Sequence, residues 1–400
     1  MIIFFAAVLR LAGRQSGAEE NATLWDLQKL GTPPAVEIAE EFDTEACHAI
    51  FFEGEPWRGK PTKVFAYYGL PKSASRDAPV PGIVCVHGGS GTAFAEWVQI
   101  WNKHGFAAIA LDTNGAVPQS INEDPDKFRH EWAGPPRYGF NQSDQPPQDQ
   151  WPYHAVAAIV RAHSLLRSFP EVDSSKIGIT GISWGGYLTC LTAGIDPRFK
   201  FAIPVYGCGF LDEGSTWTDA IHKYGRDRWM GWWDPSSYLA GANLATLWIN
   251  GTNDPHYHLP FFQKTYRLPH GPRNLSIRVR MDHGHGSGWS PPEIYAFAKA
   301  AVGTGDPLVE IAERGLDESL AWVRYRSAGD DRVASAELNY STDAGGWTER
   351  NWNTIPARLD RESFRAEIEL PLGTTVYYFN VLDDRRLLVS SEHVVTSSGK

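Results

Sequence analysis

The sequence contains little cysteine, and the thiols that are present do not form a metal motif. Four cysteines occur in 400 residues: Cys47, Cys85, Cys190 and Cys208. No two of them have the C-x-x-C spacing of a zinc or redox site. Cys85 and Cys190 fall in apolar stretches, so we expect buried thiols that behave as small hydrophobic side chains. A Cys190–Cys208 disulfide is the alternative.

Clusters of basic residues are also absent. The formal net charge is −10 at pH 7, and Lys and Arg gather nowhere along the chain. This balance argues against nucleic acid and against an anionic membrane as a partner. The apolar run at residues 1–11 (MIIFFAAVLRL) contains Arg10, and it is too short to span a membrane.

Residues 1–20 are interpreted as a signal or leader segment. Ser16-Gly17-Ala18 offers small residues at a cleavage site, but no Lys or Arg precedes the apolar run. The run is thus an imperfect signal peptide, the remnant of a longer one, or an ordinary N-terminal segment. We expect a secreted or periplasmic protein, with a cytoplasmic location as the alternative.

Apolar and aromatic residues are plentiful. Hydrophobic residues make up 42% of the chain, with 16 Trp, 15 Tyr and 19 Phe, which is enough for a sizeable core. At this length we expect one large domain and a smaller one. Short apolar stretches such as 82–86 alternate with helical patterns such as 151–168, which predicts an α/β domain with a mostly parallel sheet over residues 21–304. Two long irregular insertions, 115–150 and 207–242, interrupt it.

The pattern changes in the last part of the chain. Phe364, Ala366 and Ile368 alternate with polar residues, which is the period of a strand with one buried face. Turn residues such as Gly345-Gly346 separate several short segments of this kind. Residues 305–400 are therefore predicted to form a small all-β sandwich of immunoglobulin or fibronectin type.

The stretch Gly181-Ile182-Ser183-Trp184-Gly185 follows an apolar segment and precedes a helical one. The G-x-S-x-G order is that of a nucleophile elbow, where a tight strand-to-helix turn strains the serine backbone and exposes its hydroxyl. Glycines two residues before and after the serine remove side chains that would collide there. Because glycine and serine are common, the motif alone favours an ordinary structural turn. The nucleophile interpretation therefore depends on whether the partner residues occur in the right order.

The partners occur in the order that the chemistry needs. A serine hydroxyl becomes nucleophilic when a histidine takes its proton and a carboxylate orients that histidine. In this fold the chain order is Ser, acid, His. Asp254 follows the predicted strand 245–250, and Asp282-His283-Gly284-His285 follows the predicted strand 276–281. We predict that Ser183, Asp254 and His285 form a catalytic triad. His283 is the alternative base, and Asp282 is the alternative acid.

A glycine-rich loop, His87-Gly88-Gly89-Ser90-Gly91, follows the apolar stretch 82–86. In acyl transfer, charge develops on the carbonyl oxygen and two fixed backbone N–H groups offset it. Losing one such donor costs about 3 kcal/mol. We predict the N–H groups of Gly89 and Trp184 as the oxyanion hole, with the Ser90 N–H as the alternative to Gly89.

A metal site is the competing interpretation of the same stretches. His-x-His pairs bind zinc in proteins. Six residues of these stretches are possible metal ligands: Asp254, His256, His258, Asp282, His283 and His285. No motif supplies a further ligand, and serine chemistry explains the order of the residues. We therefore expect no metal and no cofactor, and we interpret His256 and His258 as loop or pocket residues.

Four motifs together resemble the α/β-hydrolases, in the acetyl xylan esterase, dienelactone hydrolase and prolyl oligopeptidase-like branches. They are VCVHGGSGTAFAEW (84–97), GISWGGYLT (181–189), LWINGTNDP (247–255) and MDHGHGSGW (281–289). The resemblance covers roughly residues 35–302 and implies the triad and oxyanion donors given above. Trp184 replaces the Gln usual in acetyl xylan esterases, and the segment before residue 35 is too short for the β-propeller of a prolyl oligopeptidase.

These features predict a serine carboxylic-ester hydrolase that works through an acyl-enzyme on acylated carbohydrate, with acetyl as the expected group. A serine peptidase and a non-catalytic carbohydrate-binding protein are the alternatives. Tryptophans in loops suit sugar rings, and we predict four that bind substrate: Trp132, Trp229, Trp232 and Trp289. Trp217 and Trp233 lie in the same insertion as two of them. The expected partner is a small-molecule or glycan ester, and the oligomeric state stays open.

Overall fold

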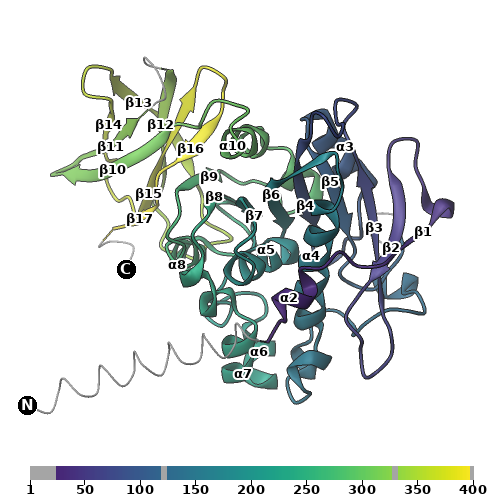
Figure 1. Ribbon diagram of the computed structural model, residues 1–400. Helices are drawn as coiled ribbons and strands as arrows, with labels where there is room; N and C mark the ends of the chain where they lie inside the picture. Colours follow the sequence, from purple (N-terminus) through teal and green to yellow (C-terminus); the bar gives the residue numbers. More distant parts are fainter. Residues whose placement is uncertain (1–23, 119–123, 327–331, 397–400) are drawn as a thin grey trace, which may run out of the picture.

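The computed structural model describes residues 24–118, 124–326 and 332–396. Within them the chain forms a nine-stranded sheet with helices on both faces and, after it, an eight-stranded antiparallel sheet (Figure 1). The predicted leader, residues 1–20, lies outside the described residues. No helix in the described part of the chain is long and apolar enough to cross a membrane.

The nine-stranded sheet is mixed, with the order β1-β2-β3-β5-β4-β6-β7-β8-β9. Pairings from β5 through β9 in this order are parallel, and those among β1, β2, β3 and β5 are antiparallel. The strands are β1 (Val36–Ile38), β2 (His48–Glu53), β3 (Lys63–Gly69), β4 (Val80–Val86), β5 (Ala107–Leu111), β6 (Val172–Ile182), β7 (Phe201–Val205), β8 (Ala245–Gly251) and β9 (Arg273–Arg278). The expectation of a mostly parallel sheet is thus confirmed for six strands, and β2 was missed.

Helices connect the parallel strands and also lie before β1 and after β9. They are α2 (Leu27–Leu30), α3 (Ala95–Lys103), α4 (Trp151–Arg167), α5 (Trp184–Ile195), α6 (Thr218–Tyr224), α7 (Arg226–Trp232), α8 (Leu259–Tyr266), α9 (His285–Trp289) and α10 (Glu293–Ala301). Short 3-10 turns lie at 40–42, 125–128, 140–142, 147–149, 235–237 and 239–241. Where the structure describes them (115–118, 124–150 and 207–242), the predicted insertions therefore contain short turns and the helices α6 and α7 as their helical elements.

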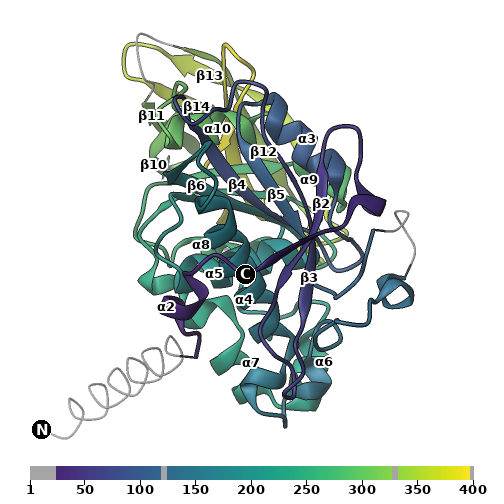
Figure 2. The same cartoon turned by 45° about the vertical axis from the view of Figure 1, so that its right-hand side comes forward.

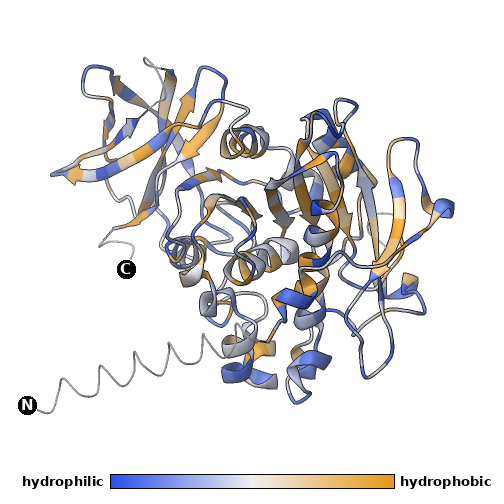
Figure 3. Cartoon of the chain, in the orientation of Figure 1, coloured by the Kyte–Doolittle hydropathy of each residue, from blue (hydrophilic) through white to orange (hydrophobic). Residues whose placement is uncertain are grey.

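The core lies between the sheet and its helices. Ile83, Val84 and Val86 in β4 have no exposed surface, as expected for a strand covered on both faces. Helices α4 and α5 pack together on one face, and α3 meets α10 on the other, where the Trp101 and Tyr295 rings lie 4.9 Å apart. Figure 3 shows hydrophobic residues concentrated on these strands. This packing makes the carboxyl ends of the strands a rigid platform.

The antiparallel sheet has the order β10-β11-β14-β13-β12-β15-β16, and β17 pairs with β15. Its strands are β10 (Glu310–Asp317), β11 (Leu320–Arg326), β12 (Val333–Ser341), β13 (Asn353–Asp360), β14 (Arg365–Glu369), β15 (Val376–Asp383), β16 (Leu388–Ser390) and β17 (Val394–Val395). Residues 353–357 of β13 pair with β12, and residues 358–360 pair with β14. The expectation of a separate antiparallel β region in the C-terminal part of the chain is confirmed.

The two sheets meet along β9 and β16 (Figure 1). Figure 2 shows β10, β11, β13 and β14 together on one side of the α/β unit. The Ile277 N–H donates to Ser390 Oγ at 2.7 Å, and the Leu388 N–H donates to the buried Glu293 carboxylate at 2.6 Å. These contacts attach the antiparallel sheet beside the strand that precedes His283. All four cysteines are buried and free, so the alternative Cys190–Cys208 disulfide does not form.

Candidate active site

Ser183 stands at a sharp turn between β6 and α5. Its backbone has φ 58° and ψ −116°, a combination that costs a non-glycine residue free energy. The Ser183 N–H donates to the Val205 carbonyl of the neighbouring strand at 2.9 Å, which ties the turn to the sheet. A Cβ on Gly185 would lie 1.9 Å from the Val86 carbonyl oxygen, and one on Gly181 would lie 2.1 Å from the Gly185 oxygen. Glycine is therefore required at both positions.

Replacing Gly185 with alanine is expected to displace the turn or destabilise the fold. Overpacking of this kind costs about 1–3 kcal/mol or more, because the atom met by the new Cβ is backbone that cannot turn aside. Gly241→Ala is the matched control, since a Cβ there meets nothing within 4 Å. Denaturant unfolding of the two variants measures the difference, and equal stabilities would contradict the packing argument.

Asp254 lies in the loop after β8, with a side chain that has no exposed surface. One carboxylate oxygen accepts the N–H groups of His256 at 2.9 Å and Tyr257 at 2.7 Å. The other oxygen lies 2.6 Å from Nδ1 of His283. The carboxylate is thus held by two backbone donors and aimed at one imidazole, which leaves His283 Nε2 directed away from the acid.

The predicted base, His285, is placed elsewhere. Strand β9 ends at Arg278, three residues earlier than predicted, and the chain turns at residues 279–280, where Arg280 has φ 53°, before it brings His283 to Asp254. His285 already begins α9, and the helical turn points its ring toward the glycine-rich loop. Its Nε2 accepts the Gly88 N–H at 2.9 Å. The histidine that the acid orients is His283, the alternative, and not His285.

The surroundings of His285 keep its ring neutral. The Phe94 ring lies 4.7 Å away, and burial, reinforced by the nearby His87 and His283, lowers the pKa of His285 to about 3. A neutral imidazole has one acceptor nitrogen, and here that nitrogen binds the glycine-rich loop. A Cβ on Gly91 would lie 2.7 Å from the same nitrogen. His285 therefore packs into the loop and supports it.

Asp282 is the alternative acid, but among the described residues no contact joins its carboxylate to His283. Its side chain is exposed, and its carbonyl oxygen accepts the Tyr206 hydroxyl at 2.6 Å. The Tyr206 ring packs 4.5 Å from the His283 ring, and Tyr206 directly follows the residue whose carbonyl binds the Ser183 N–H. Tyr206, which the sequence analysis missed, thus links the elbow to the His283 loop.

The glycine-rich loop lies against the start of α5. A Cβ on Gly89 would be 2.7 Å from Cδ1 of Trp184 and 2.6 Å from the Tyr138 hydroxyl. Within the described part of the chain, the Gly88 N–H is occupied by His285, whereas the Gly89 N–H donates to no protein acceptor. Trp184, as the first residue of α5, has an N–H with no carbonyl four residues earlier in the helix. Both predicted donors are therefore available, and the Ser90 N–H, the alternative to Gly89, likewise donates to no acceptor among the described residues.

Aromatic rings from the two insertions meet above the elbow. The Trp184 ring packs 5.1 Å from Tyr138 and 4.7 Å from Trp217. Trp217 is half-buried, and its ring also lies 5.5 Å from His256. His256 in turn lies 4.8 Å from His283. Trp217 and Tyr138 therefore pack against Trp184, the residue after Ser183, and only the enrichment of Trp in the insertions pointed to Trp217.

The four predicted substrate-binding tryptophans are dispersed. Trp229 is 1% exposed and packs 4.3 Å from Phe140, so it belongs to the core. Trp232 packs beside Trp233, and Trp132 packs under the Lys63 ammonium at 3.9 Å, on the antiparallel side of the sheet. Trp289 is close to the site, with its ring 6.2 Å from His285, but it is 8% exposed. Their spacing carried no information on which loops fold over the elbow.

No group of three or more His, Cys, Asp or Glu side chains within residues 24–118, 124–326 and 332–396 converges in a way that can hold a metal ion. The His256 ring is hydrogen-bonded at 2.8 Å to the Thr216 hydroxyl. His258 lies 3.4 Å from the Thr348 hydroxyl. In the two His-x-His pairs, His256 and His258 thus contact hydroxyl groups. His283 contacts Asp254, and His285 contacts Gly88.

Two protein families match parts of the chain. The acetyl xylan esterase family matches residues 21–213, and the prolyl oligopeptidase family matches residues 144–301. Both matches include Ser183, and the second also includes Asp254 and His283. Neither reaches the antiparallel sheet.

Known proteins agree with these matches. The acetyl esterase Axe7A of Xylanibacter ruminicola is 27% identical over 157 residues, which is 38% of this chain and 35% of that protein. The chain thus spans about a third of the length of this curated relative. Among solved structures, an acetyl xylan esterase from Paenibacillus sp. R4 is similar with TM-score 0.53 and 20% identity, over 66% of this chain and 89% of that one. Acetyl xylan esterase 1 from Thermoanaerobacterium sp. JW/SL YS485 gives TM-score 0.53 and 17% identity, over 68% and 88%.

Proposed function

We propose that this chain, which belongs to the α/β-hydrolase superfamily, is a serine carboxylic-ester hydrolase that removes acyl groups, acetyl above all, from carbohydrate. The observation that carries the proposal is the Asp254–His283 pair, joined at 2.6 Å, beside a serine in a strained elbow. The acetyl esterase relative and the acetyl xylan esterase family match support the acyl group and the substrate class.

In the proposed mechanism Ser183 Oγ attacks the ester carbonyl while His283 Nε2 takes the hydroxyl proton. Asp254 holds the tautomer with the proton on Nδ1 and stabilises the imidazolium that forms. The Gly89 and Trp184 N–H groups offset the charge on the carbonyl oxygen. The intermediate collapses as His283 returns the proton to the leaving alcohol, and water then releases the acyl group from Ser183 with His283 again as base.

The crowding at Gly89 supports a small acyl group. Tyr138 and Trp184 already lie close enough that a single added carbon on Gly89 would overlap both of them. The space next to the proposed oxyanion donors is therefore narrow, which suits acetyl better than a long acyl chain. The half-exposed Trp217 ring beside His256 offers a flat apolar face of the kind that sugar rings pack against.

The domain roles, the type of the antiparallel sheet and the N-terminal segment are also proposals. We propose that residues 21–304 act as the catalytic domain and residues 305–400 as an accessory domain, and that its antiparallel sheet is of immunoglobulin or fibronectin type. Secretion or export is proposed from the segment 1–20 alone. Strand β13 pairs with β12 over one part of its length and with β14 over the other. This supports a sandwich in which β13 joins the two layers.

A covalent label tests the proposed function. The purified protein is expected to release acetate from 4-nitrophenyl acetate and from acetylated xylo-oligosaccharides, and to take up one organophosphonate at Ser183. Ser183→Ala, which removes only the nucleophile, serves as the unlabelled control. An intact, folded protein that neither hydrolyses these esters nor takes up the label would refute the proposal.

A serine peptidase is the second candidate, because the prolyl oligopeptidase match alone spans Ser183, Asp254 and His283. Labelling of Ser183 does not distinguish the two activities, since both proceed through an acyl-enzyme. Aminoacyl 4-nitroanilides do distinguish them. A peptidase would cleave these amides and leave acetylated sugars intact, whereas the esterase is expected to show the opposite preference.

A further inference from the structure

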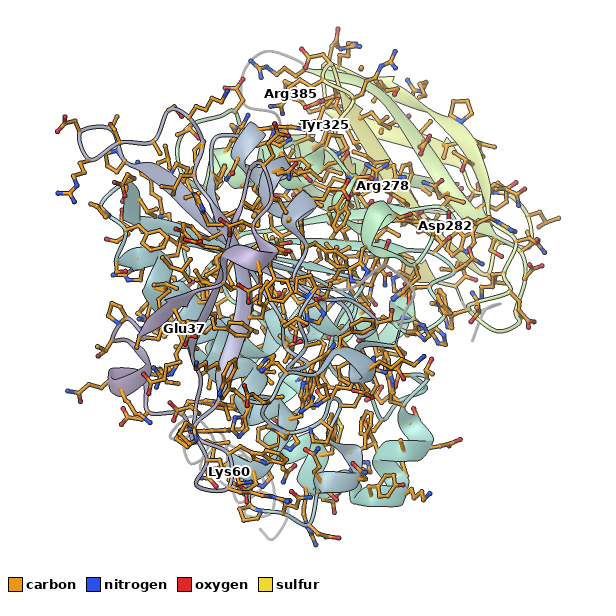
Figure 4. The ribbon with its side chains drawn as sticks, turned by 90° about the vertical axis from the view of Figure 1, so that its right-hand side faces the viewer. Glu37, Lys60, Arg278, Asp282, Tyr325 and Arg385 are labelled. Carbon is orange, nitrogen blue, oxygen red and sulfur yellow. The ribbon has the colours of Figure 1, made fainter. Side chains whose placement is uncertain are left out.

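A cavity of about 600 Å³ adjoins His283 on the side of the antiparallel sheet. Its wall is made by Asn253 and Pro255 from the acid loop, by residues 280–283 after β9, and by Thr348. Thr348 belongs to the β12–β13 loop, residues 342–352, so the region after residue 304 contributes to a cavity that contains the proposed base. Figure 4 shows Asp282 on the side of the α/β unit that faces the antiparallel strands.

The β12–β13 loop is hydrogen-bonded both to the loop that contains Asp254 and to the segment that precedes His283. The Asn253 side-chain amide donates to the carbonyls of Thr348 and Arg350, each at 2.9 Å. The Arg280 guanidinium donates to the Asn351 side chain at 3.0 Å. These bonds tie the neighbour of Asp254 and the start of the His283 segment to the same short loop. Its position against the cavity is therefore set by direct hydrogen bonds to the α/β unit.

The loop also holds its own shape. The Asn351 N–H donates to the Asp343 carboxylate at 2.6 Å, and the Arg350 guanidinium donates to the Gly345 carbonyl at 3.0 Å. The same guanidinium stacks on the Trp347 ring at 4.1 Å. A site built on a loop that is held in this way is preorganised, which lowers the entropy lost when a ligand binds. Thr348 is thus presented to the cavity in one position.

We propose that this cavity binds the alcohol part of the ester, a neutral polyhydroxylated ring, and that Thr348 of the β12–β13 loop completes it. The inference rests on the proposed ester hydrolase. His283 must deliver a proton to the departing alkoxide, so the alcohol has to lie against the His283 ring, and His283 lines this cavity. Its volume is within the range of about 300–1,000 Å³ typical of small-molecule sites.

The lining suits hydroxyl groups. Arg280 supplies donors, the Asp282 carboxylate supplies acceptors, and the Thr348 hydroxyl supplies both. One positive and one negative side chain leave no excess charge, which favours a neutral ligand over an anionic one. All three side chains are exposed at the rim, so a sugar within a longer chain can enter without being enclosed. A neutral acylated glycan therefore fits better than an acidic one.

The test separates the alcohol site from the reacting serine. Thr348→Trp fills the cavity, and Thr342→Trp, at an exposed position of the same loop outside the cavity wall, is the matched control. We expect Thr348→Trp to lower kcat/KM for acetylated xylo-oligosaccharides by about tenfold or more, because the alcohol is misplaced. The rate at which a small phosphonofluoridate labels Ser183 is expected to stay unchanged, since its fluoride leaving group needs no such site.

Each other outcome has a defined meaning. If both tryptophan variants hydrolyse the oligosaccharide at the wild-type rate, the cavity does not bind the alcohol and the inference is overturned, although the esterase remains. If Thr348→Trp slows labelling as much as hydrolysis, the loop acts on the catalytic groups and not on the alcohol, which also overturns it. A wild-type protein that neither labels nor hydrolyses refutes the proposed function itself. Thermal melting confirms that the variants are folded.

Discussion

His283→Ala is expected to lower kcat for ester hydrolysis by about 10⁶-fold, the cost of removing the base from a serine triad. The reason is geometric: Nδ1 of His283 is 2.6 Å from the Asp254 carboxylate, which orients this imidazole, whereas Nε2 of His285 is occupied by the Gly88 N–H. Steady-state hydrolysis of 4-nitrophenyl acetate measures the loss. Added imidazole is expected to restore part of the rate, because the variant leaves a space of that shape beside the acid.

His285→Gln is the comparison that identifies the base. The glutamine oxygen can still accept the Gly88 N–H that His285 accepts at 2.9 Å, so the glycine-rich loop keeps its support. We expect this variant to retain most of its kcat. Burial lowers the pKa of His285 to about 3, which fits a neutral ring whose Nε2 accepts the Gly88 N–H. If His285→Gln were inactive and His283→Ala active, the assignment of His283 would be wrong.

Asp254→Asn is expected to lower kcat by about 10⁴-fold, as the corresponding change does in serine triads. The asparagine oxygen can still accept the N–H groups of His256 and Tyr257, which bind Asp254 at 2.9 and 2.7 Å. Its NH₂ group then faces His283 Nδ1, where only an acceptor nitrogen fits. The imidazole proton moves to Nε2, and that nitrogen can no longer take the proton of Ser183. The fold is preserved while the tautomer is wrong.

The pH dependence and a second variant check this explanation. Unfolding midpoints of wild type and Asp254→Asn are expected to be close, because the backbone hydrogen bonds survive. Asp282→Asn, at the alternative acid, is expected to affect KM for carbohydrate esters and not kcat. A large loss of kcat in Asp282→Asn with little loss in Asp254→Asn would reverse the choice of acid. At high pH the rate of Asp254→Asn is expected to recover in part, since hydroxide can replace the missing base.

Much of the α/β framework was readable from local patterns. The apolar stretch 82–86 and the helical spacing in 151–168 became β4 and α4, because each element's period reflects its own burial. The elbow could be placed for the same reason, since Gly181 and Gly185 are dictated by backbone contacts within a few residues of Ser183 and with β4. Strand β2 was missed, and its four central residues are buried in a row without alternation.

The choice between His283 and His285 was beyond the sequence. Both histidines follow the same strand within two residues of each other, and the outcome depends on where β9 ends and α9 begins. A shift of a few residues turns a side chain from one neighbour to another, and local propensity does not determine element ends that closely. Only the position of Asp254, about thirty residues earlier in the chain, selects His283.

The sequence by itself determined that Ser183 sits between a strand and a helix, that acid and histidine follow in order, and that an antiparallel region comes last. The tertiary structure alone decided which histidine meets Asp254, that Trp217 and Tyr138 lie over the elbow, and that Thr348 reaches the cavity at His283. The physical reason is the range of the forces. Backbone sterics and apolar periodicity act between near neighbours and leave a local pattern, whereas loop contacts depend on how distant segments pack and leave none.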